Sequence, residues 1–164
     1  MKKLFALLLI SLPLAMGFTA CNDDDDLPDV STSLTVENAR VLGDTIYIVQ
    51  GDTLDVAGIN IQNNEKGKKA QIISAEYHFA GKLVQSLVPP YGFKLAVSAD
   101  PNSVYYMPAG KYDLIVYMNI AAEDKALAIG AMSYWLRVVA SADDIPADAV
   151  ATTTTNQQTF VAKQ

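Results

Sequence analysis

The sequence predicts an all-β protein, built as a single antiparallel sandwich. Between about residues 34 and 140, apolar and polar residues alternate with the period of two that is typical of half-buried strands. Turn residues interrupt this alternation at short intervals, as at Gln50–Asp52 and Ala80–Lys82. The region holds about a hundred residues, enough to bury the core of one domain.

The first part of the domain contains three expected strands, over residues 34–36, 45–49 and 53–61. The third strand changes phase within its length. Leu54 and Val56 share one face, whereas Ile59 and Ile61 fall on the other set of positions. We expect a β-bulge at Ala57–Gly58, because one extra residue restores the alternation.

The middle of the domain begins with a polar loop over residues 62–69, followed by a clear strand over residues 70–79. His78, the only histidine, falls on the solvent-facing phase of this strand. Shorter strands are expected over residues 83–88 and 93–97, separated by the break Pro89–Gly92. The inward positions of the 70–79 strand are Ile73, Ala75, Tyr77 and Phe79.

The strongest strand pattern covers residues 111–120, after a long connection over residues 98–110 that could include a short strand at 104–107. Residues 126–140 follow as a second long apolar strand. A helix over residues 121–131 is the alternative, because alanine and leucine favour helices. We prefer a hairpin because the segment continues into the β-rich residues 134–139. The inward positions are Tyr112, Leu114, Val116, Met118, Ile120, Met132, Tyr134, Leu136 and Val138.

The N-terminus has the pattern of a secretory signal. Lys2 and Lys3 precede an apolar run over residues 4–16, which Ser11 and Pro13 interrupt. The run is too short and too broken for a spanning helix, whereas its flanks suit a cleaved signal. A buried hydrophobic helix is the alternative. We therefore expect residues 1–20 to be a signal peptide.

The end of that signal, Phe18-Thr19-Ala20-Cys21, resembles a bacterial lipobox, with phenylalanine where leucine is usual. The resemblance implies that the thiol of Cys21 takes a diacylglyceryl group, that cleavage frees its amino group, and that this group is acylated in turn, with palmitate as a typical chain. Two or three acyl chains anchor a protein stably, whereas one chain does not.

The acidic run Asn22–Asp26 resembles the surface-export signal of Bacteroidetes lipoproteins. It implies an acidic tether over residues 21–33 and a lipid-anchored location at the outer membrane or cell surface. A solvated spacer is a compatible interpretation, because like charges repel. A calcium-binding loop is a weaker alternative, because the oxygen spacing and central glycine of an EF-hand are absent.

Composition excludes several classes of protein. The formal net charge is −6 and becomes −8 once Lys2 and Lys3 are removed with the signal. The sequence has no basic stripe, so we expect no nucleic-acid partner. Cys21 is the only cysteine, which leaves no disulfide and no cysteine-based zinc site.

The tail over residues 141–164 is rich in threonine and glutamine and is expected to be mostly disordered.

The segment Pro108–Leu114 resembles the Gly-x-Tyr-x-apolar start of strand F in immunoglobulin-like domains. The resemblance implies a tyrosine corner, with the Tyr112 ring in the core and its hydroxyl bonded back to the turn. Residues 75–82 resemble the strand–Gly-Lys–strand hairpin of bacterial immunoglobulin-like modules, and Pro89–Tyr91 matches their Pro-aromatic pair. We therefore expect one immunoglobulin-like β-sandwich over residues 34–140. Such modules serve as spacers, adhesion units and accessory domains of surface glycan systems.

No catalytic constellation can be assembled from the sequence. One histidine supports no Ser-His-Asp arrangement with a second motif, and no spacing supports a carboxylate pair, although two acids could still meet in space. Met118 and Met132 fall on core-facing phases, where methionine usually fills gaps. We expect neither an enzyme nor a cofactor or metal site.

Aromatic side chains are the candidate binding residues. Tyr117 and Trp135 fall on the outward phase of adjacent strands, where they would form an apolar patch unless the N-terminal segment or the tail covers it. The second group lies in the loops, where ordinary packing is the alternative. We expect an interaction or spacer module with a protein partner, or a carbohydrate-binding accessory module that uses the loop residues Tyr91, Phe93, Tyr105 and Tyr106.

Overall fold

The computed structural model describes residues 27–151 and 154–161. The expected signal peptide, Cys21 and the acidic run lie outside the described residues. In the part that is described, no helix has the length and apolarity needed to cross a membrane.

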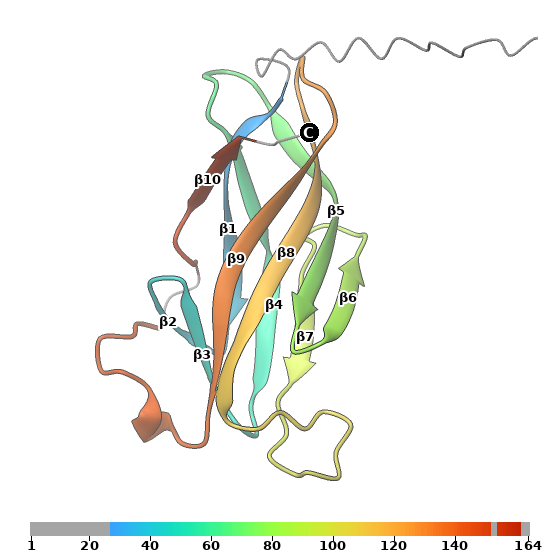
Figure 1. Cartoon of the computed structure of the whole chain (residues 1–164). Helices are drawn as coiled ribbons and strands as arrows, with labels where there is room; N and C mark the ends of the chain where they lie inside the picture. The colour runs from blue at the N-terminus through green and yellow to red at the C-terminus, as the bar shows by residue number, and fades with distance from the viewer. Residues whose placement is uncertain (1–26, 152–153, 162–164) are drawn as a thin grey trace, which may run out of the picture.

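The described residues form ten strands in two sheets that pack face to face (Figure 1). The four-stranded sheet has the order β10 (Gln158–Val161), β1 (Asp29–Glu37), β4 (Thr53–Asn63), β7 (Phe93–Ala96). The six-stranded sheet has the order β2 (Arg40–Leu42), β3 (Thr45–Val49), β9 (Ala128–Val139), β8 (Gly110–Ala122), β5 (Ala70–Phe79), β6 (Lys82–Ser86). A 3₁₀ turn, η2 (Ala142–Asp144), follows β9.

The chain crosses between the two sheets six times among the described strands, from β1 to β2, β3 to β4, β4 to β5, β6 to β7, β7 to β8 and β9 to β10. The two packed sheets form a β-sandwich, as predicted. Strand pairing is antiparallel with one exception among the described strands, because β3 runs parallel to β9. The six-stranded sheet is therefore mixed.

The core lies between the sheets and follows the predicted alternation on β8 and β9. From Leu114 to Ile120 and from Met132 to Val138, every second side chain is at most 1 % exposed. The segment 121–131, for which a helix was the alternative, contains the end of β8, the turn over residues 123–127 and the start of β9, so the predicted hairpin is confirmed.

Two β-bulges adjust the strands to the core. The register between β1 and β4 shifts where Thr35 faces Gly58 and Val36 faces Val56, so Ala57 is the extra residue, as predicted. A second shift, between Ile72 and Ser74 of β5, was not predicted. It buries Ile72 and leaves Ile73 46 % exposed, so the expectation that Ile73 faces the core is wrong.

The tyrosine corner that the resemblance implies is present at the start of β8. The Tyr112 hydroxyl donates a hydrogen bond to the carbonyl of Pro108, with an O–O distance of 2.7 Å. The half-buried ring packs against the core. This bond fixes the turn that leads the chain from the 98–109 loop into β8.

The two chain ends differ from the prediction. Residues 29–33, expected in the tether, belong to β1, where Val30 and Thr32 are at most 1 % exposed. The expected disordered tail is ordered over much of its length: Val150 pairs with Val41, and β10 pairs with β1. The polar composition of both segments concealed strands whose backbone groups are satisfied by pairing.

The tail also joins the two sheets. The Gln158 side chain accepts a hydrogen bond from the Ser133 backbone N–H at 3.1 Å and donates one to the Ser133 carbonyl at 2.8 Å. Ser133 lies on β9 beyond the part that pairs with β3, so this side chain satisfies a backbone edge that β3 leaves open. β10 therefore closes one side of the sandwich (Figure 1).

Candidate functional site

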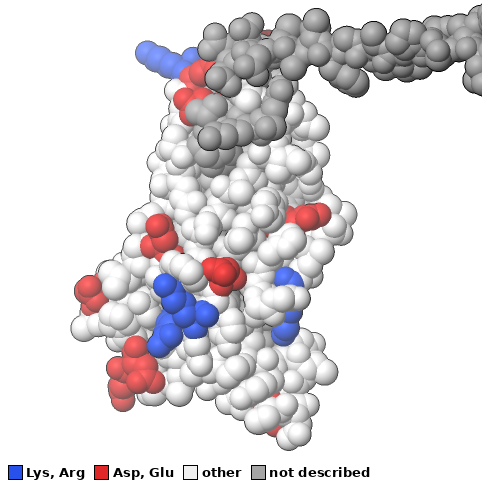
Figure 2. Space-filling model, in the orientation of Figure 1, with Lys and Arg blue, Asp and Glu red and all other residues white. Residues whose placement is uncertain are grey.

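The outer face of the six-stranded sheet carries exposed aromatic and cationic side chains. Tyr117 of β8 and Trp135 of β9 are each 41 % exposed on this face, so neither is covered. Figure 2 views the molecule from this side. Both predicted residues thus point outward, as their phase required.

Tyr117 and Trp135 do not form the single patch that the sequence suggested. Tyr117 faces Ala131 across the ladder, whereas Trp135 faces Asp113, four positions farther along. Each ring has its own polar neighbour: the ring of His78 lies edge-on to Tyr117 at 5.1 Å between centroids. The Lys111 ammonium sits 3.6 Å above the centre of a Trp135 ring.

His78 lies on the outer face, as predicted, with its side chain 41 % exposed. Its Nε2 atom is shielded from solvent and has no hydrogen-bond partner among the described residues. The nearest carboxylate oxygen, on Glu76, is 3.5 Å away, and the Glu76 carboxylate accepts a bond from Gln85 at 2.8 Å. The pair therefore consists of an imidazole and a carboxylate from one strand, with Gln85 as the partner of the carboxylate.

Four side chains from four strands form a straight row across this face, which we call the cation row. Arg40 of β2 pairs in register with Tyr47 of β3, Tyr47 with Arg137 of β9, and Arg137 with Lys111 of β8. Residues opposite one another in a ladder share a face, so all four side chains lie on the solvent side. Strands lie about 4.8 Å apart, so the row is about 14 Å long.

The three cations of the row have no carboxylate within ion-pair distance in the part of the chain that is described. Other lysines of the sandwich are paired: Lys94 lies 2.6 Å from Asp55, and Lys68 contacts Asp124. The hydrogen bond and charge of Asp55 hold the pKa of Lys94 above its usual value. Figure 2 shows basic side chains gathered on the lower part of the viewed face.

Tyr91 and Phe93, expected as loop binding residues, are part of the internal packing. The Tyr91 hydroxyl donates to the Ile72 carbonyl at 2.7 Å, and its own carbonyl accepts from Tyr77 at 2.6 Å. The Phe93 ring packs against Tyr77 at 4.4 Å and against Phe79 at 5.4 Å between centroids. Burial raises the pKa of Tyr77. The structure therefore does not offer Tyr91 and Phe93 as a loop binding surface.

Tyr105 and Tyr106 remain exposed, at 54 % and 37 %, in the loop over residues 98–109. Hydrogen bonds inside the loop hold its shape: Asp100 accepts from the backbone N–H of Asn102, and Ser103 accepts from the backbone N–H of Tyr105. The loop lies at the end of the sandwich opposite the start of β1 (Figure 1).

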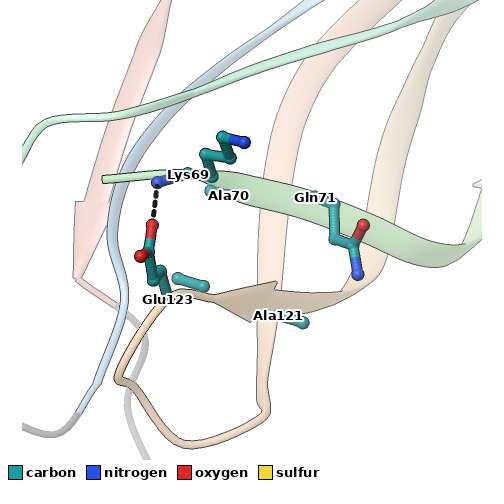
Figure 3. A pocket seen from close by; sticks show the side chains of 6 residues that line it. Lys69, Ala70, Gln71, Ala121 and Glu123 are labelled. Atoms are coloured by element: carbon teal, nitrogen blue, oxygen red, sulfur yellow. Dashed lines mark hydrogen bonds between the residues drawn. The ribbon is translucent and has the colours of Figure 1, made fainter. Parts of the chain in front are cut away.

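A shallow hollow near the start of β5 is shown in Figure 3. The Lys69 backbone N–H donates to the Glu123 carboxylate at 3.3 Å across it. It presents a single acidic side chain, which provides no acid–base pair. Across the described residues, no three histidine, cysteine, aspartate or glutamate side chains are grouped as metal ligands. The hollow is lined by Lys69, Ala70, Gln71, Ala121, Ala122 and Glu123.

Comparison of the sequence with protein-family models and with curated proteins finds no match. Its function is therefore inferred from the residues of this chain.

The cation row is the feature that sequence reasoning missed. Its members are separated by up to 97 positions in the sequence and meet only through cross-strand pairing, including the parallel pair β3–β9. The alternation of β9 places Arg137 on the same outward phase as Trp135, and this phase is the signal that the sequence offers.

Proposed function

We propose that the protein is a lipid-anchored, non-catalytic interaction or spacer module of the outer membrane or cell surface. The observation that carries the proposal is the outer face of the six-stranded sheet, where Tyr117, Trp135 and the three cations of the row are exposed and Tyr47 is half-buried. Exposed aromatic and arginine side chains are typical of binding surfaces, because they bury a large area and desolvate readily.

The anchor determines how this face is presented. Residues 21 to 27 span at most about 20 Å when fully extended, so a lipid on Cys21 keeps the start of β1 close to the membrane. The 98–109 loop then points away from the bilayer, and the outer face stands on the side of the sandwich. Partners can reach both surfaces without competing with the lipid.

A carbohydrate-binding accessory module is the second candidate. Its support is the preformed 98–109 loop, which presents Tyr105 and Tyr106 at the membrane-distal end. A tyrosine ring can stack on a sugar and use its hydroxyl as a hydrogen-bond partner. The loop is already ordered by its own hydrogen bonds, so binding would lose little conformational entropy.

The anchor is tested on intact cells by external protease treatment of wild type and Cys21→Ala, with the mass of the mature N-terminus. We expect an acylated N-terminus at Cys21, cleavage of wild type from outside, and release of the variant from the membrane. An unmodified N-terminus, or a chain protected from external protease, contradicts the proposed location.

The interaction surface is tested by placing a photo-crosslinking amino acid at Tyr117 or at Gln62, which is exposed on β4 of the other sheet. We expect specific crosslinked species from position 117 and none from position 62. Absence of crosslinks from position 117, or equal crosslinking from both positions, overturns the assignment of this face.

A further inference from the structure

We propose that the cation row binds an anionic polysaccharide, a chain of uronate or sulfated sugars that lies across strands β2, β3, β9 and β8. This proposal rests on the proposed function as an interaction module and names the ligand class. It uses the row Arg40, Tyr47, Arg137 and Lys111 together with the neighbouring Trp135.

Charge complementarity supports an anion. Arg40, Arg137 and Lys111 are exposed, and none of them has an ion-pair partner in the described chain. Three neighbouring cations repel one another, which is unfavourable in the free protein and is relieved by a bound anion. Guanidinium groups also bind carboxylate and sulfate-like groups through two parallel hydrogen bonds.

The spacing and rings of the row suit a sugar chain. Arg40 and Arg137 flank Tyr47, so a planar ring lies between two cations in register. Such a ring can stack on a sugar face while its neighbours bind the acidic substituents. The Lys111 ammonium already rests on the Trp135 ring at 3.6 Å, which limits the side-chain entropy lost on binding.

A neighbouring carboxylate determines the direction in which the polysaccharide would lie on the sheet. Asp113 pairs with Trp135, two residues along the ladder from the pair Lys111–Arg137. An anion that ran along β8 and β9 would therefore meet a like charge. An anion that runs across the strands stays over the cations. At the β2 end, Arg40 and Tyr47 line a hollow that also contains the carboxylate of Asp52, so the anionic polysaccharide would end over Arg40, before it reaches this like charge.

A polysaccharide fits this surface better than an acidic peptide. The row offers side chains on a flat sheet face, and its outermost strand, β2, is already paired through Val41 and Val150, so a peptide could not gain strand-addition hydrogen bonds along it. A flexible peptide would also lose more conformational entropy on a flat surface than a chain of rigid sugar rings.

Binding is measured with the mature lipidated chain in neutral detergent micelles, using polygalacturonate, dextran sulfate, neutral dextran and polyglutamate as probes. Wild type is compared with Arg40→Gln/Arg137→Gln. The control is Lys66→Gln/Lys68→Gln, which removes the same charge from the loop after β4. Thermal unfolding of each variant shows whether it is folded.

We expect wild type to bind polygalacturonate, dextran sulfate or both, and not neutral dextran, with an affinity that falls as salt is added. The row variant should lose at least about tenfold in affinity, whereas the control keeps wild-type affinity. Binding of only one polyanion identifies the acidic group as carboxylate or sulfate.

Three results overturn the proposal: no binding of either polysaccharide, equal losses in the row variant and the control, or tighter binding of polyglutamate. These outcomes are separate from those of the crosslinking test. Crosslinks from position 117 without polyanion binding remove the ligand class and leave the interaction module in place. Polyanion binding without crosslinks removes the protein partner instead.

Discussion

The outer faces of the two sheets treat their polar groups differently. On the four-stranded sheet, Asn60 donates to Ser33 and Thr35 at 3.3 and 2.9 Å, and Lys94 pairs with Asp55. On the β2–β3–β9 part of the six-stranded sheet, Arg40 and Arg137 have no such partner in the described chain. The polar groups named on the four-stranded sheet thus bond to one another, whereas the two arginines of the six-stranded sheet are available to a ligand.

This difference shows where stability and binding reside. A face whose polar groups bond to one another contributes to the fold and offers few groups to a ligand. A face with exposed rings and unpaired guanidinium groups contributes little to the fold and offers much to a partner. Substitutions in the four-stranded sheet should therefore lower the stability of the protein. Substitutions on the outer face of the six-stranded sheet should have little effect on it.

The largest difference is expected between two glycines. A methyl group at Gly92 would overlap backbone atoms of Val56 and Ala57, where the chain enters β7. At Gly110 of β8, the methyl group would only touch the Tyr112 side chain, at 3.4 Å. We expect Gly92→Ala to lower the free energy of unfolding by about 3 kcal/mol and Gly110→Ala by less than about 1 kcal/mol. Urea unfolding measures both, and equal losses contradict the comparison.

A smaller effect is expected from a buried hydroxyl at the edge of the four-stranded sheet. The Thr155 hydroxyl accepts from the Leu34 backbone N–H at 2.9 Å and donates to the Tyr134 hydroxyl at 3.0 Å. Thr155→Val leaves both groups without this partner, and we expect a loss of about 2 kcal/mol.

Thr45→Val on β3 is the matched control for this substitution. No hydrogen bond of the half-buried Thr45 hydroxyl is found among the described residues. The same chemical change should therefore have little effect on urea unfolding. A loss at Thr45 as large as that at Thr155 would show that the two sheets do not differ in this respect.

The smallest effect is expected from two cations. Lys94→Met removes the partner of Asp55, whose side chain is only 11 % exposed, so we expect a small decrease in Tm. Arg137→Met removes a charge with no ion-pair partner in the described chain, so Tm should stay unchanged or rise slightly. Differential scanning calorimetry of the two variants compares them directly, and the opposite order would reverse the assignment of the two faces.

The strands that could be predicted are those whose own side chains specify them. β8 and β9 carry an apolar side chain at every second position over most of their length, so their buried faces follow from the period of two. β1 and β10 contain serine, threonine and glutamine, and their stability comes from pairing with each other and with β4. Pairing of this kind is a tertiary property and leaves little local signal.

The candidate site likewise has a part that could be predicted from the sequence and a part that could not. The outward directions of Tyr117 and Trp135 followed from their phase, and the cation row did not, because it needed the register of three strand pairs. Tyr91 and Phe93 were expected in a binding loop because their neighbours are Pro89, Pro90 and Gly92. That turn instead directs both rings against Ile72, Tyr77 and Phe79.

The position of β1 has a mechanical consequence. β1 begins at the end of the sandwich near the expected anchor and runs toward the 98–109 loop (Figure 1), and it is hydrogen-bonded to β10 on one side and β4 on the other. Ladder hydrogen bonds in antiparallel pairs lie perpendicular to the strands. Under the proposed anchoring, a pull between the membrane and a ligand at the far end would load the bonds on both sides of β1 in shear, all at once. A domain tethered in this way resists extension better than one whose first strand is peeled away bond by bond.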